Sequence, residues 1–551
     1  MWKELGWNFF LEHKLKFIIY GLIILVVFPL EAVFLPEIYG QMFDKLKSLN
    51  SFPNMFDFIK NMKAKNVAGL MAVLIVTWII IIGSGTIKYY FESKLVPEYL
   101  KFIRHVIYEK TIETYAEEYS DLKTGDYMSR VMELSRNFKD LFQMGLTRVV
   151  PEFIVSLIIT IYLFYKNKKI GIITGIVFIV CMVIQYFGLK KLVKIIAEKE
   201  QFFNTELSEN LTDSLENLMN IYINNEMDSQ VKKNEKLEEI NNQYMKKVMS
   251  METVVIYGTQ FLILLGYAVS IYVLYYLMKK KEVDVKAGIV LILILGQFIN
   301  YYMWTNSAFV HQIIYKLGII EGSREYLDKL FKENKKRTKT GVINKGSISL
   351  QNVGFKHNKR KDEYLFENLN WDIQGGEKVA LVGRSGTGKS TLMKLMISLF
   401  PIDAGKIEID GTNMKEIKVE YLREKINYIN QRTNLFDESI LYNIRFGNND
   451  ITDKEIIEKL KKYKLDSVYS ELPDGVNAKA GVHGGNLSGG MQKVTMLMRG
   501  MLRSSKVVLI DEPLSGLDGN TRVKAIDMIM QECRDKTLVV ITHDEEILPH
   551  M

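Results

Sequence analysis

Residues 379–396 read VALVGRSGTGKSTLMKLM, in which an apolar run is followed by a glycine-rich turn and then by a helical run. Gly383, Gly388, Lys389 and Ser390 fit the phosphate-binding loop pattern G-x-x-x-x-G-K-[ST]. Such glycines let successive backbone N–H groups surround phosphate oxygens, and the following helix presents its positive N-terminus. We expect Lys389 to reach the β- and γ-phosphates and Ser390 to bind Mg²⁺. The residues predicted to contact the nucleotide are Gly383, Ser385, Gly386, Thr387, Gly388, Lys389, Ser390 and Thr391.

A second motif, KVVLIDEP at residues 506–513, places two acids directly after an apolar run. Sheets of α/β domains present ligand-binding groups at the carboxyl ends of their strands. Asp511 is therefore predicted to bind Mg²⁺, and Glu512 to polarise the attacking water. From residue 346 onward, short β-branched runs alternate with amphipathic segments, which predicts an α/β domain around both motifs.

The composition divides the chain into two parts. Its 551 residues exceed the length of about 250 to 300 residues at which single cores usually stop growing. Residues 1–310 contain long apolar runs, whereas the chain from residue 332 has a soluble composition. The net charge of +8 comes from scattered lysines, so nucleic acid is not expected as a partner. The two cysteines, Cys181 and Cys533, are expected to be buried thiols and not part of a disulfide or zinc site.

Six apolar segments approach the length of about 20 residues that a helix needs to cross a bilayer. They are residues 17–38, 67–90, 147–165, 170–190, 254–278 and 287–307. The longest segments between them, 91–146 and 191–253, are charged, and the one proline in them is Pro97. This pattern predicts helices that continue well beyond the bilayer on one side.

Polar residues recur on the last predicted span. Gln297, Asn300, Trp304 and His311 follow one another at intervals of three, four and seven, which places them on one helix face. The first interpretation is that this polar stripe lines a translocation cavity, because polar groups in membrane helices usually face the bundle interior or water. The second is that it forms hydrogen bonds between helices.

These patterns predict a multi-domain membrane protein with an all-α six-helix transmembrane domain, long cytosolic helical extensions and an α/β phosphate-loop ATPase domain. Residues 1–331 are assigned to the transmembrane domain, including an interfacial N-terminal helix, residues 332–345 to a linker, and residues 346–551 to the nucleotide-binding domain. We place the soluble domain and the N-terminus in the cytosol because the predicted chemistry needs cytosolic nucleotide. The lysines of the short loops 166–169 and 279–286 run against the positive-inside rule.

The stretch LSGG at residues 487–490 lies between the phosphate-binding loop and Asp511. With it, the chain resembles the ATP-binding cassette (ABC) transporters, in the exporter-type arrangement of six membrane helices followed by one nucleotide-binding domain. The resemblance covers nearly the whole chain. It implies that Ser488, Gly489 and Gly490 contact the γ-phosphate of an ATP held by a second chain. Residues 123–131 and 212–226 resemble segments that carry or follow the coupling helices of the membrane domain.

The same resemblance implies a catalytic set. Gln431, in INQRTNLF, matches a glutamine that senses Mg²⁺ and the membrane domain, and His543, in VVITHD, matches a histidine that contacts the γ-phosphate. Asp518 ends the SGLD loop, Ser515–Asp518, which crosses the dimer seam in the family. Glu512, His543 and Gln431 are thus expected to act in hydrolysis, and Ser390, Gln431 and Asp511 to hold Mg²⁺.

Four features depart from the family pattern. His357 stands where a tyrosine usually stacks on adenine, and GVHG at residues 481–484 lacks the usual acid and arginine. Met491 stands where glutamine is usual, so we expect one peripheral hydrogen bond near the nucleotide to be lost. The sequence ends at Met551, earlier than is usual, so we expect the closing strands to be absent.

The resemblance implies ATP-driven export of a substrate by a dimer of half-transporters that alternates the access of a central cavity. A homodimer is favoured, because this chain supplies both Glu512 and His543; a heterodimer is the alternative. The competing hypothesis is a nucleotide-gated regulatory or binding membrane protein that hydrolyses little ATP, motivated by His357, Val482 and Met491. The expected partners are a second chain, the lipid bilayer and the transported substrate, with ATP and Mg²⁺ as cofactors.

Overall fold

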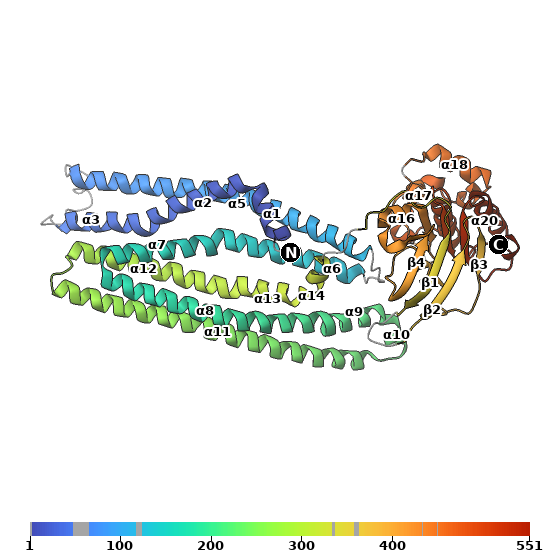
Figure 1. The fold of residues 1–551 in the computed structure, drawn as a ribbon. Helices are drawn as coiled ribbons and strands as arrows, with labels where there is room; N and C mark the ends of the chain where they lie inside the picture. The colour runs from blue at the N-terminus through green and yellow to red at the C-terminus, as the bar shows by residue number, and fades with distance from the viewer. Residues whose placement is uncertain are drawn as a thin grey trace. The chain divides into compact units, whose positions relative to one another are not determined.

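A computed structural model describes residues 3–47, 65–116, 124–332, 337–356, 363–431, 434–448 and 450–551 (Figure 1). The chain divides into two compact units. The membrane unit comprises residues 1–112 and 122–332, and the soluble unit comprises residues 113–121 and 333–551.

The membrane unit is helical throughout its described part. Its α-helices are α1 (Asn8–Glu12), α2 (Lys14–Pro29), α3 (Leu35–Lys47), α5 (Lys65–Tyr115), α6 (Thr124–Met144), α7 (Val150–Lys166), α8 (Lys168–Phe202), α9 (Ser208–Glu216), α10 (Leu218–Ile223), α11 (Met227–Lys279), α12 (Val285–Ala308), α13 (Tyr315–Gly322) and α14 (Arg324–Leu330). Short π-helical segments join several of them: η1 (Lys3–Trp7), η2 (Leu30–Phe34), η3 (Gly145–Val149), η4 (Phe203–Leu207) and η5 (Phe309–Ile314).

Six helices among the described residues are long and apolar enough to cross a membrane, which confirms the predicted number. They are Lys14–Lys45, Gly69–Tyr115, Val131–Lys166, Lys168–Glu216, Met227–Lys279 and Val285–Trp304. The helix α11 has 53 residues and is therefore about 80 Å long, far more than a bilayer core of about 30 Å. The predicted extensions beyond the bilayer are thus present.

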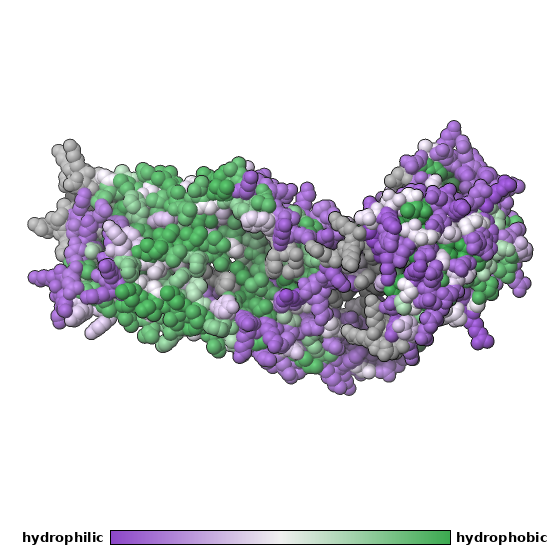
Figure 2. Space-filling view, viewed as in Figure 1, coloured by the Kyte–Doolittle hydropathy of each residue, from purple (hydrophilic) through white to green (hydrophobic). Residues whose placement is uncertain are grey.

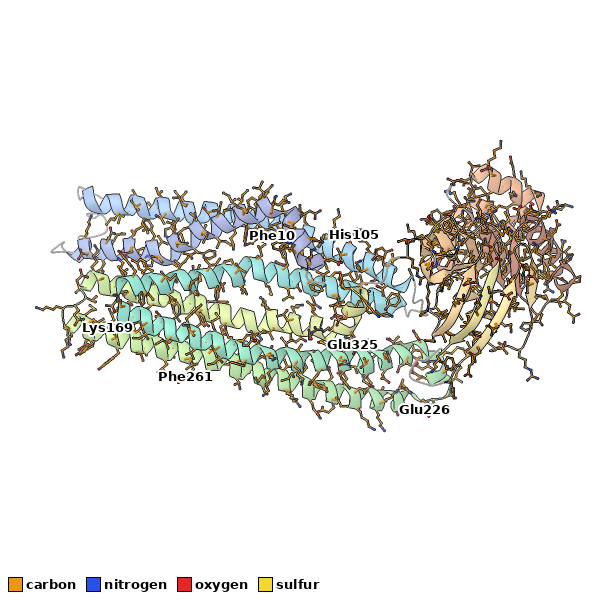
Figure 3. The ribbon with its side chains drawn as sticks, viewed as in Figure 1. Phe10, His105, Lys169, Glu226, Phe261 and Glu325 are labelled. Atoms are coloured by element: carbon orange, nitrogen blue, oxygen red, sulfur yellow. The ribbon has the colours of Figure 1, made fainter. Side chains whose placement is uncertain are left out.

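The membrane unit has an apolar surface between two hydrophilic ends (Figure 2). Lys169 lies at one end, Glu226 at the other, and Phe261 on the apolar surface between them (Figure 3). At the first end, the Lys166 ammonium lies 2.6 Å from the Glu37 carboxylate. This distribution is typical of helices that face lipid, because only the ends meet water.

The described residues of the soluble unit form two sheets. The strands are β1 (Ile348–Phe355), β2 (Phe366–Ile373), β3 (Lys378–Leu381), β4 (Ala404–Ile409), β5 (Thr412–Asn413), β6 (Ile426–Ile429), β7 (Val507–Asp511) and β8 (Thr537–Ile541). The antiparallel sheet has the order β2-β1-β4-β5, and the parallel sheet has the order β3-β8-β7-β6. The residues of β7 and β8 are all buried, as the apolar runs in their sequences require.

Helices and short 3₁₀ turns complete the soluble unit. The α-helices are α15 (Lys389–Met396), α16 (Val419–Lys425), α17 (Ile440–Arg445), α18 (Asp453–Lys462), α19 (Gly489–Met501) and α20 (Gly519–Glu532). The 3₁₀ turns are η6 (Met414–Glu416), η7 (Asp466–Tyr469), η8 (Gly475–Asn477), η9 (Val482–Gly484) and η10 (Leu548–His550). The predicted α/β fold is confirmed.

Both cysteines are buried and free, as predicted. Cys181 is buried on α8, and Cys533 is buried directly after α20. Burial raises the pKa of the Cys533 thiol to about 11. The thiol is therefore protonated and unreactive near neutral pH.

Candidate nucleotide site

The predicted motifs meet at one edge of the parallel sheet. Gly383 follows β3, His543 follows β8, Glu512 follows β7 and Gln431 follows β6. Because parallel strands end at the same edge, the strand order β3-β8-β7-β6 brings the loops of four distant motifs into one row. The expectation that Asp511 and Glu512 lie at the carboxyl end of a strand is confirmed.

The glycine-rich loop between β3 and α15 requires backbone conformations that favour glycine. The φ angles of Gly386 and Gly388 are +83° and +92°. A Cβ atom on Gly388 would also lie 2.7 Å from Cζ of Phe366, so both the backbone angle and the space require glycine there. The Lys389 ammonium donates hydrogen bonds to the carbonyl oxygens of Gly383 at 2.7 Å and Arg384 at 2.8 Å.

This loop fits a phosphate group. Ser385, Gly386 and Thr387 are exposed, and the residues from Gly388 to Thr391 are half-buried where the helix begins. The first backbone N–H groups of a helix have no partner within the helix, and they lie here beside the Lys389 ammonium. The loop therefore offers the Lys389 ammonium and several N–H donors to an anion, with Arg384 as a second positive charge on its exposed side.

The two acids at the end of β7 have different surroundings. Asp511 is only 2% exposed, and the Tyr428 hydroxyl lies 3.5 Å from its Oδ2. Glu512 has a φ of +48°, a left-handed conformation that turns the chain sharply after the strand. Its Oε2 accepts a hydrogen bond from the Gln431 amide at 2.7 Å, and its Oε1 lies 4.0 Å from Nε2 of His543.

Glu512, Gln431 and His543, the three residues expected to act in catalysis, are thus in one cluster. In this arrangement the glutamine orients the carboxylate, and the histidine lies 4.0 Å from its other oxygen. A carboxylate oriented by one hydrogen bond, with its other oxygen open, can accept a proton from a neighbouring water molecule.

The predicted Mg²⁺ ligands are Ser390, Gln431 and Asp511, which offer oxygen atoms of the kind that Mg²⁺ prefers. No group of three or more histidine, cysteine or acidic side chains suited to a metal is found among the described residues. A site with so few protein ligands fits Mg²⁺, which usually keeps waters and binds phosphate oxygens of its substrate. When bound, the ion neutralises phosphate charge.

Lys493, which the motifs did not identify, lies on α19 and is only 5% exposed. Burial lowers the pKa of its ammonium group, and the nearby carboxylates of Asp511 and Glu512 raise it part of the way back. The sequence signal was weak, because a lysine three residues beyond the glycines looks like a solvated side chain until tertiary packing brings it near Asp511 and Glu512.

The LSGG segment begins α19. The Ser488 hydroxyl accepts a hydrogen bond from the backbone N–H of Met491 at 3.3 Å, so this serine is the N-cap of the helix. Gly489 and Gly490 form its first turn and leave the backbone N–H groups open to an anion. The chain therefore has a second element that suits phosphate, separate in sequence from the loop at Lys389.

Met491 lies in the apolar core with 7% exposure, beside Leu487 and Val494. The next residue, Gln492, donates from its amide to the carbonyl oxygens of Gly484 at 2.9 Å and Leu487 at 3.1 Å. The expectation of a lost hydrogen bond near the nucleotide thus concerns a side chain that points inward. The methionine fills the core behind the serine.

Asp518 is the N-cap of α20 and accepts hydrogen bonds from the backbone N–H groups of Asn520 and Thr521, both at 3.0 Å. Hydrogen bonds from Thr521 hold the pKa of its carboxyl group below the usual value. Two other predictions fall on positions that cannot be compared: His357 and Lys123 lie outside the described residues. The segment 212–226 contains the separate short helix α10, Leu218–Ile223.

Comparison with known families identifies both units. The profile of the ABC transporter transmembrane region matches residues 18–302, more than half of the chain, and the profile described as ABC transporter matches residues 366–515. The chain belongs to the ABC transporter family. Its second matched region implies a domain that binds ATP.

Curated relatives match a little over a third of this ABC transporter. ABC transporter B family member 2 of Dictyostelium discoideum is 37% identical over 198 residues, 36% of this chain and 14% of that protein. The mitochondrial iron-sulfur clusters transporter ATM1 of Yarrowia lipolytica is 38% identical over 201 residues, 36% of this chain and 28% of that protein. The matched part of this chain thus spans less than a third of the length of either relative.

A solved structure resembles this ABC transporter over almost its whole length. A bacterial Atm1-family ABC exporter with ATP bound superposes with a TM-score of 0.80, covering 97% of this chain and 92% of that chain at 16% identity. At that identity the likeness shows the fold alone.

In the membrane unit of this ABC transporter, the polar stripe does not behave as one set. Trp304 is 64% exposed and Asn300 is exposed, whereas the ring nitrogen Nδ1 of His311 lies 3.2 Å from Glu252 of α11. The π-helical segment η5, Phe309–Ile314, interrupts the helical spacing between Trp304 and His311.

Hydrogen bonding between helices is made by Asn306, which sequence reasoning missed. The Gln185 amide of α8 donates to Asn306, and the Asn306 amide donates to the Thr259 hydroxyl of α11, both at 2.5 Å. All three side chains are buried. Three helices are thus joined by one buried polar network. The signal was a single asparagine in an apolar run, which periodicity did not assign to the stripe.

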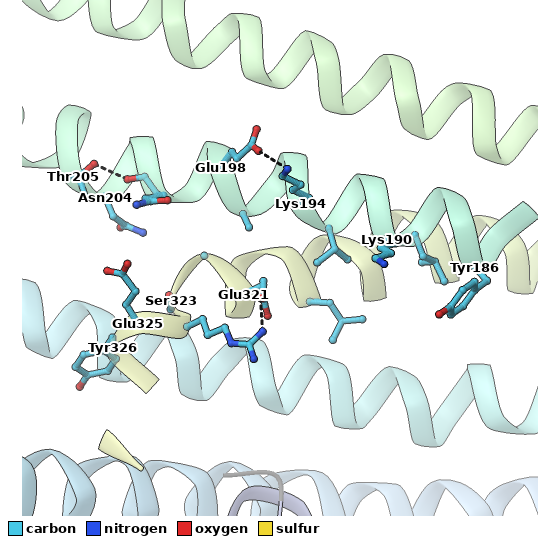
Figure 4. A pocket seen from close by; sticks show the side chains of 17 residues that line it. Tyr186, Lys190, Lys194, Glu198, Asn204, Thr205, Glu321, Ser323, Glu325 and Tyr326 are labelled. Atoms are coloured by element: carbon cyan, nitrogen blue, oxygen red, sulfur yellow. Dashed lines mark hydrogen bonds and ion pairs between the residues drawn. The ribbon is translucent and has the colours of Figure 1, made fainter. Parts of the chain in front are cut away.

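A cavity with a volume of about 690 Å³ lies in the membrane unit between α8 and the α13–α14 segment (Figure 4). Its charged side chains are mostly paired: Lys194 lies 3.9 Å from Glu198, and Arg324 donates to Glu321 at 2.7 Å. Beside it α13 approaches α8 closely, because a Cβ on Gly318 would lie 2.4 Å from Cγ2 of Ile196. With both signs of charge in pairs, the cavity favours neither anions nor cations.

Proposed function

We propose that this chain is half of an ATP-driven exporter and that two copies form the working transporter. The observation that carries the proposal is the Glu512 carboxylate, held by the Gln431 amide at 2.7 Å and 4.0 Å from His543, on the sheet edge that also carries the phosphate-binding loop. Lys389 and Ser390 would hold ATP and Mg²⁺, Asp511 would complete the metal site, and Glu512 would activate water.

The dimer is inferred from two separate phosphate-binding elements in one chain. In the proposal, the Ser488 end of α19 in one copy closes on the γ-phosphate that Lys389 holds in the other. Closure draws the soluble units together, and the long helices carry this motion to the membrane, so that a central cavity changes from cytosolic to outward access. The soluble unit is on the cytosolic side in this scheme because it consumes cytosolic ATP.

Phosphate release from the chain in nanodiscs tests hydrolysis. We expect Glu512→Gln to lower the turnover by about 10² to 10⁴-fold while ATP binding is retained. Glu545→Gln is the matched control, since Glu545 is an exposed acid at the same edge. Unchanged turnover in Glu512→Gln would sink the mechanism. ATP binding with no phosphate release from the wild-type chain would instead select a nucleotide-gated regulatory protein.

Cross-linking tests the dimer. A chain with Ser385→Cys and Ser488→Cys, in the Glu512→Gln background, should form an ATP-dependent disulfide between copies and run at twice its mass. Either single substitution alone is the control, because it lacks the second thiol of the pair. A monomer band at all ATP concentrations would contradict the proposed arrangement.

A further inference from the structure

Arg522 lies in the first turn of α20 and bridges two loops at the edge that carries the candidate site. Its guanidinium donates to the carbonyl oxygen of Leu517 at 3.4 Å. The same group lies 3.5 Å from the carboxylate of Asp544 and 3.9 Å from that of Glu546. It was not identified from the sequence, because it belongs to no motif.

The two bridged loops leave neighbouring strands. Leu517 belongs to the loop that follows β7 and Glu512, and Gly516 before it has a φ of +78°. Asp544 belongs to the loop that follows β8, and its backbone N–H donates to the Thr542 hydroxyl at 2.9 Å. His543 lies between Thr542 and Asp544, with its side chain 51% exposed. The position of His543 therefore depends on the turn from Thr542 to Asp544, and Asp544 faces Arg522.

The surroundings of Arg522 differ from those of an ordinary surface cation. Its side chain is 29% exposed, and its Nε atom is buried without a hydrogen-bond partner. Leaving a buried donor unsatisfied is unfavourable, so the other contacts of the guanidinium hold it in place. Arg534, two residues beyond the end of the same helix, is exposed and offers a comparison.

We propose that Arg522 is a positioning residue for ATP hydrolysis, which ties the loop of Leu517 to the loop of Asp544 and so fixes His543 relative to Glu512. The inference rests on the proposed function of this site and adds a residue to it. The planar guanidinium can bind both loops at once, whereas a lysine ammonium at this position would reach fewer partners.

Hydrogen exchange of the full chain in nanodiscs, without nucleotide, tests the structural half of the proposal. Arg522→Met should speed exchange of the amides in residues 542–548 by about threefold or more, because the loop opens more often without its tie. Asp544→Asn should do the same, and Arg534→Met should not. Unchanged exchange in Arg522→Met would overturn the proposal whatever the turnover.

Steady-state phosphate release tests the catalytic half. Arg522→Met should lower kcat by about tenfold, since small displacements of reacting groups are costly, with the KM for ATP within about twofold of wild type. Arg522→Lys should recover part of the rate, and Arg522→Met with Asp544→Asn should cost no more than Arg522→Met alone. A wild-type rate in Arg522→Met overturns the role of Arg522 alone. Absence of hydrolysis in the wild-type chain overturns the proposed function, and the exchange result then stands separately.

Discussion

The soluble and membrane units place polar groups in opposite ways. In the soluble unit the strands β7 and β8 of the parallel sheet are buried, and Glu512, Gln431 and His543 stand at the edge of that sheet where ligands can reach them. In the membrane unit the apolar side chains cover the surface, while Gln185, Asn306 and other polar groups are buried between helices. The surroundings explain the difference, because water solvates exposed polar groups, whereas in lipid polar groups are stable only when they are buried and hydrogen-bonded within the protein.

This contrast determines how well chemistry can be inferred from each unit. A parallel sheet gathers its strand ends at one edge, so short motifs far apart in sequence predict neighbours in space. A bundle of long helices has no such common edge. The partner of a polar residue there depends on which helix faces it, and helical spacing alone does not say.

The largest effect is expected for Lys389, the lysine of the phosphate-binding loop. Lys389→Met should abolish ATP binding at concentrations that saturate the wild-type chain and lower turnover by about 10²-fold or more. The reason is that the loop loses one of its two positive charges, Lys389, and keeps only Arg384. Binding of a fluorescent ATP analogue measures it. Lys415→Met, an exposed lysine on η6, is the control. Tight binding by Lys389→Met would remove the phosphate site from this loop.

The next prediction concerns Met491, where the family resemblance and the structure lead to different results. If this side chain only lacked a hydrogen bond to nucleotide, Met491→Gln would raise turnover. Its burial predicts instead that the glutamine amide is placed in an apolar core, at a cost of about 1 to 3 kcal/mol in the free energy of unfolding. Thermal unfolding and turnover together decide between them. Met491→Leu, which keeps the volume and apolarity, should change little.

Within the candidate site, some residues could be predicted from the sequence and others could not. Asp511 and Glu512 were predicted because they stand at the end of an apolar strand, and His543 was predicted from the family resemblance of its motif. The orientation of Met491 was not, because it depends on Ser488 being the N-cap and so on the rotation of α19. Lys493 was missed because it meets Asp511 and Glu512 only through tertiary packing.

The same holds for the fold as a whole. The six spans and the α/β domain could be predicted because apolar length and strand-to-helix alternation are local properties of the sequence. The network of Asn306 and the break of the last long helix at η5 could not, since both depend on contacts between helices.

A third prediction concerns Asp410, a carboxylate remote from the nucleotide site, and its contribution to the stability of the soluble unit. Asp410 accepts hydrogen bonds from the backbone N–H groups of Asn344, Lys345, Gly346 and Ser347, at 2.7 to 3.0 Å. Asp410→Ala should lower the free energy of unfolding by about 2 kcal/mol, measured by urea denaturation of the full chain. Asp535→Ala, an exposed acid, is the control.

The pH dependence of this contribution follows from the same contacts. Burial raises the pKa of the Asp410 carboxyl group. The hydrogen bonds from Gly346, Asn344 and Ser347 lower this pKa by more than burial raises it, so the pKa lies below its usual value of 3.8. A carboxyl group with a lowered folded pKa stabilises the fold above its unfolded pKa. The contribution is therefore complete above pH 3.8 and is lost as the pH falls through the folded pKa. An Asp410→Ala difference that persists undiminished in stronger acid would contradict this.

The smallest expected effect probes the membrane unit. Asn306→Leu should lower stability by about 1 kcal/mol, because hydrogen bonds between membrane helices contribute little on average even though Gln185 loses its acceptor. Thermal unfolding in detergent measures it. Asn300→Leu on the exposed side of the same helix is the matched control. A larger loss for Asn300 than for Asn306 would reverse the assignment of the two faces.

The two buried cysteines make this chain suited to spectroscopic rulers. Because Cys181 and Cys533 are both concealed in the fold, a spin label or fluorophore attached to a single added thiol would report from that position alone. In the proposed dimer, such probes on α19 could follow the distance between the two copies during the proposed cycle of ATP binding and hydrolysis. Slow reaction of the two native thiols would, in the same samples, serve as a clock for how often each unit opens.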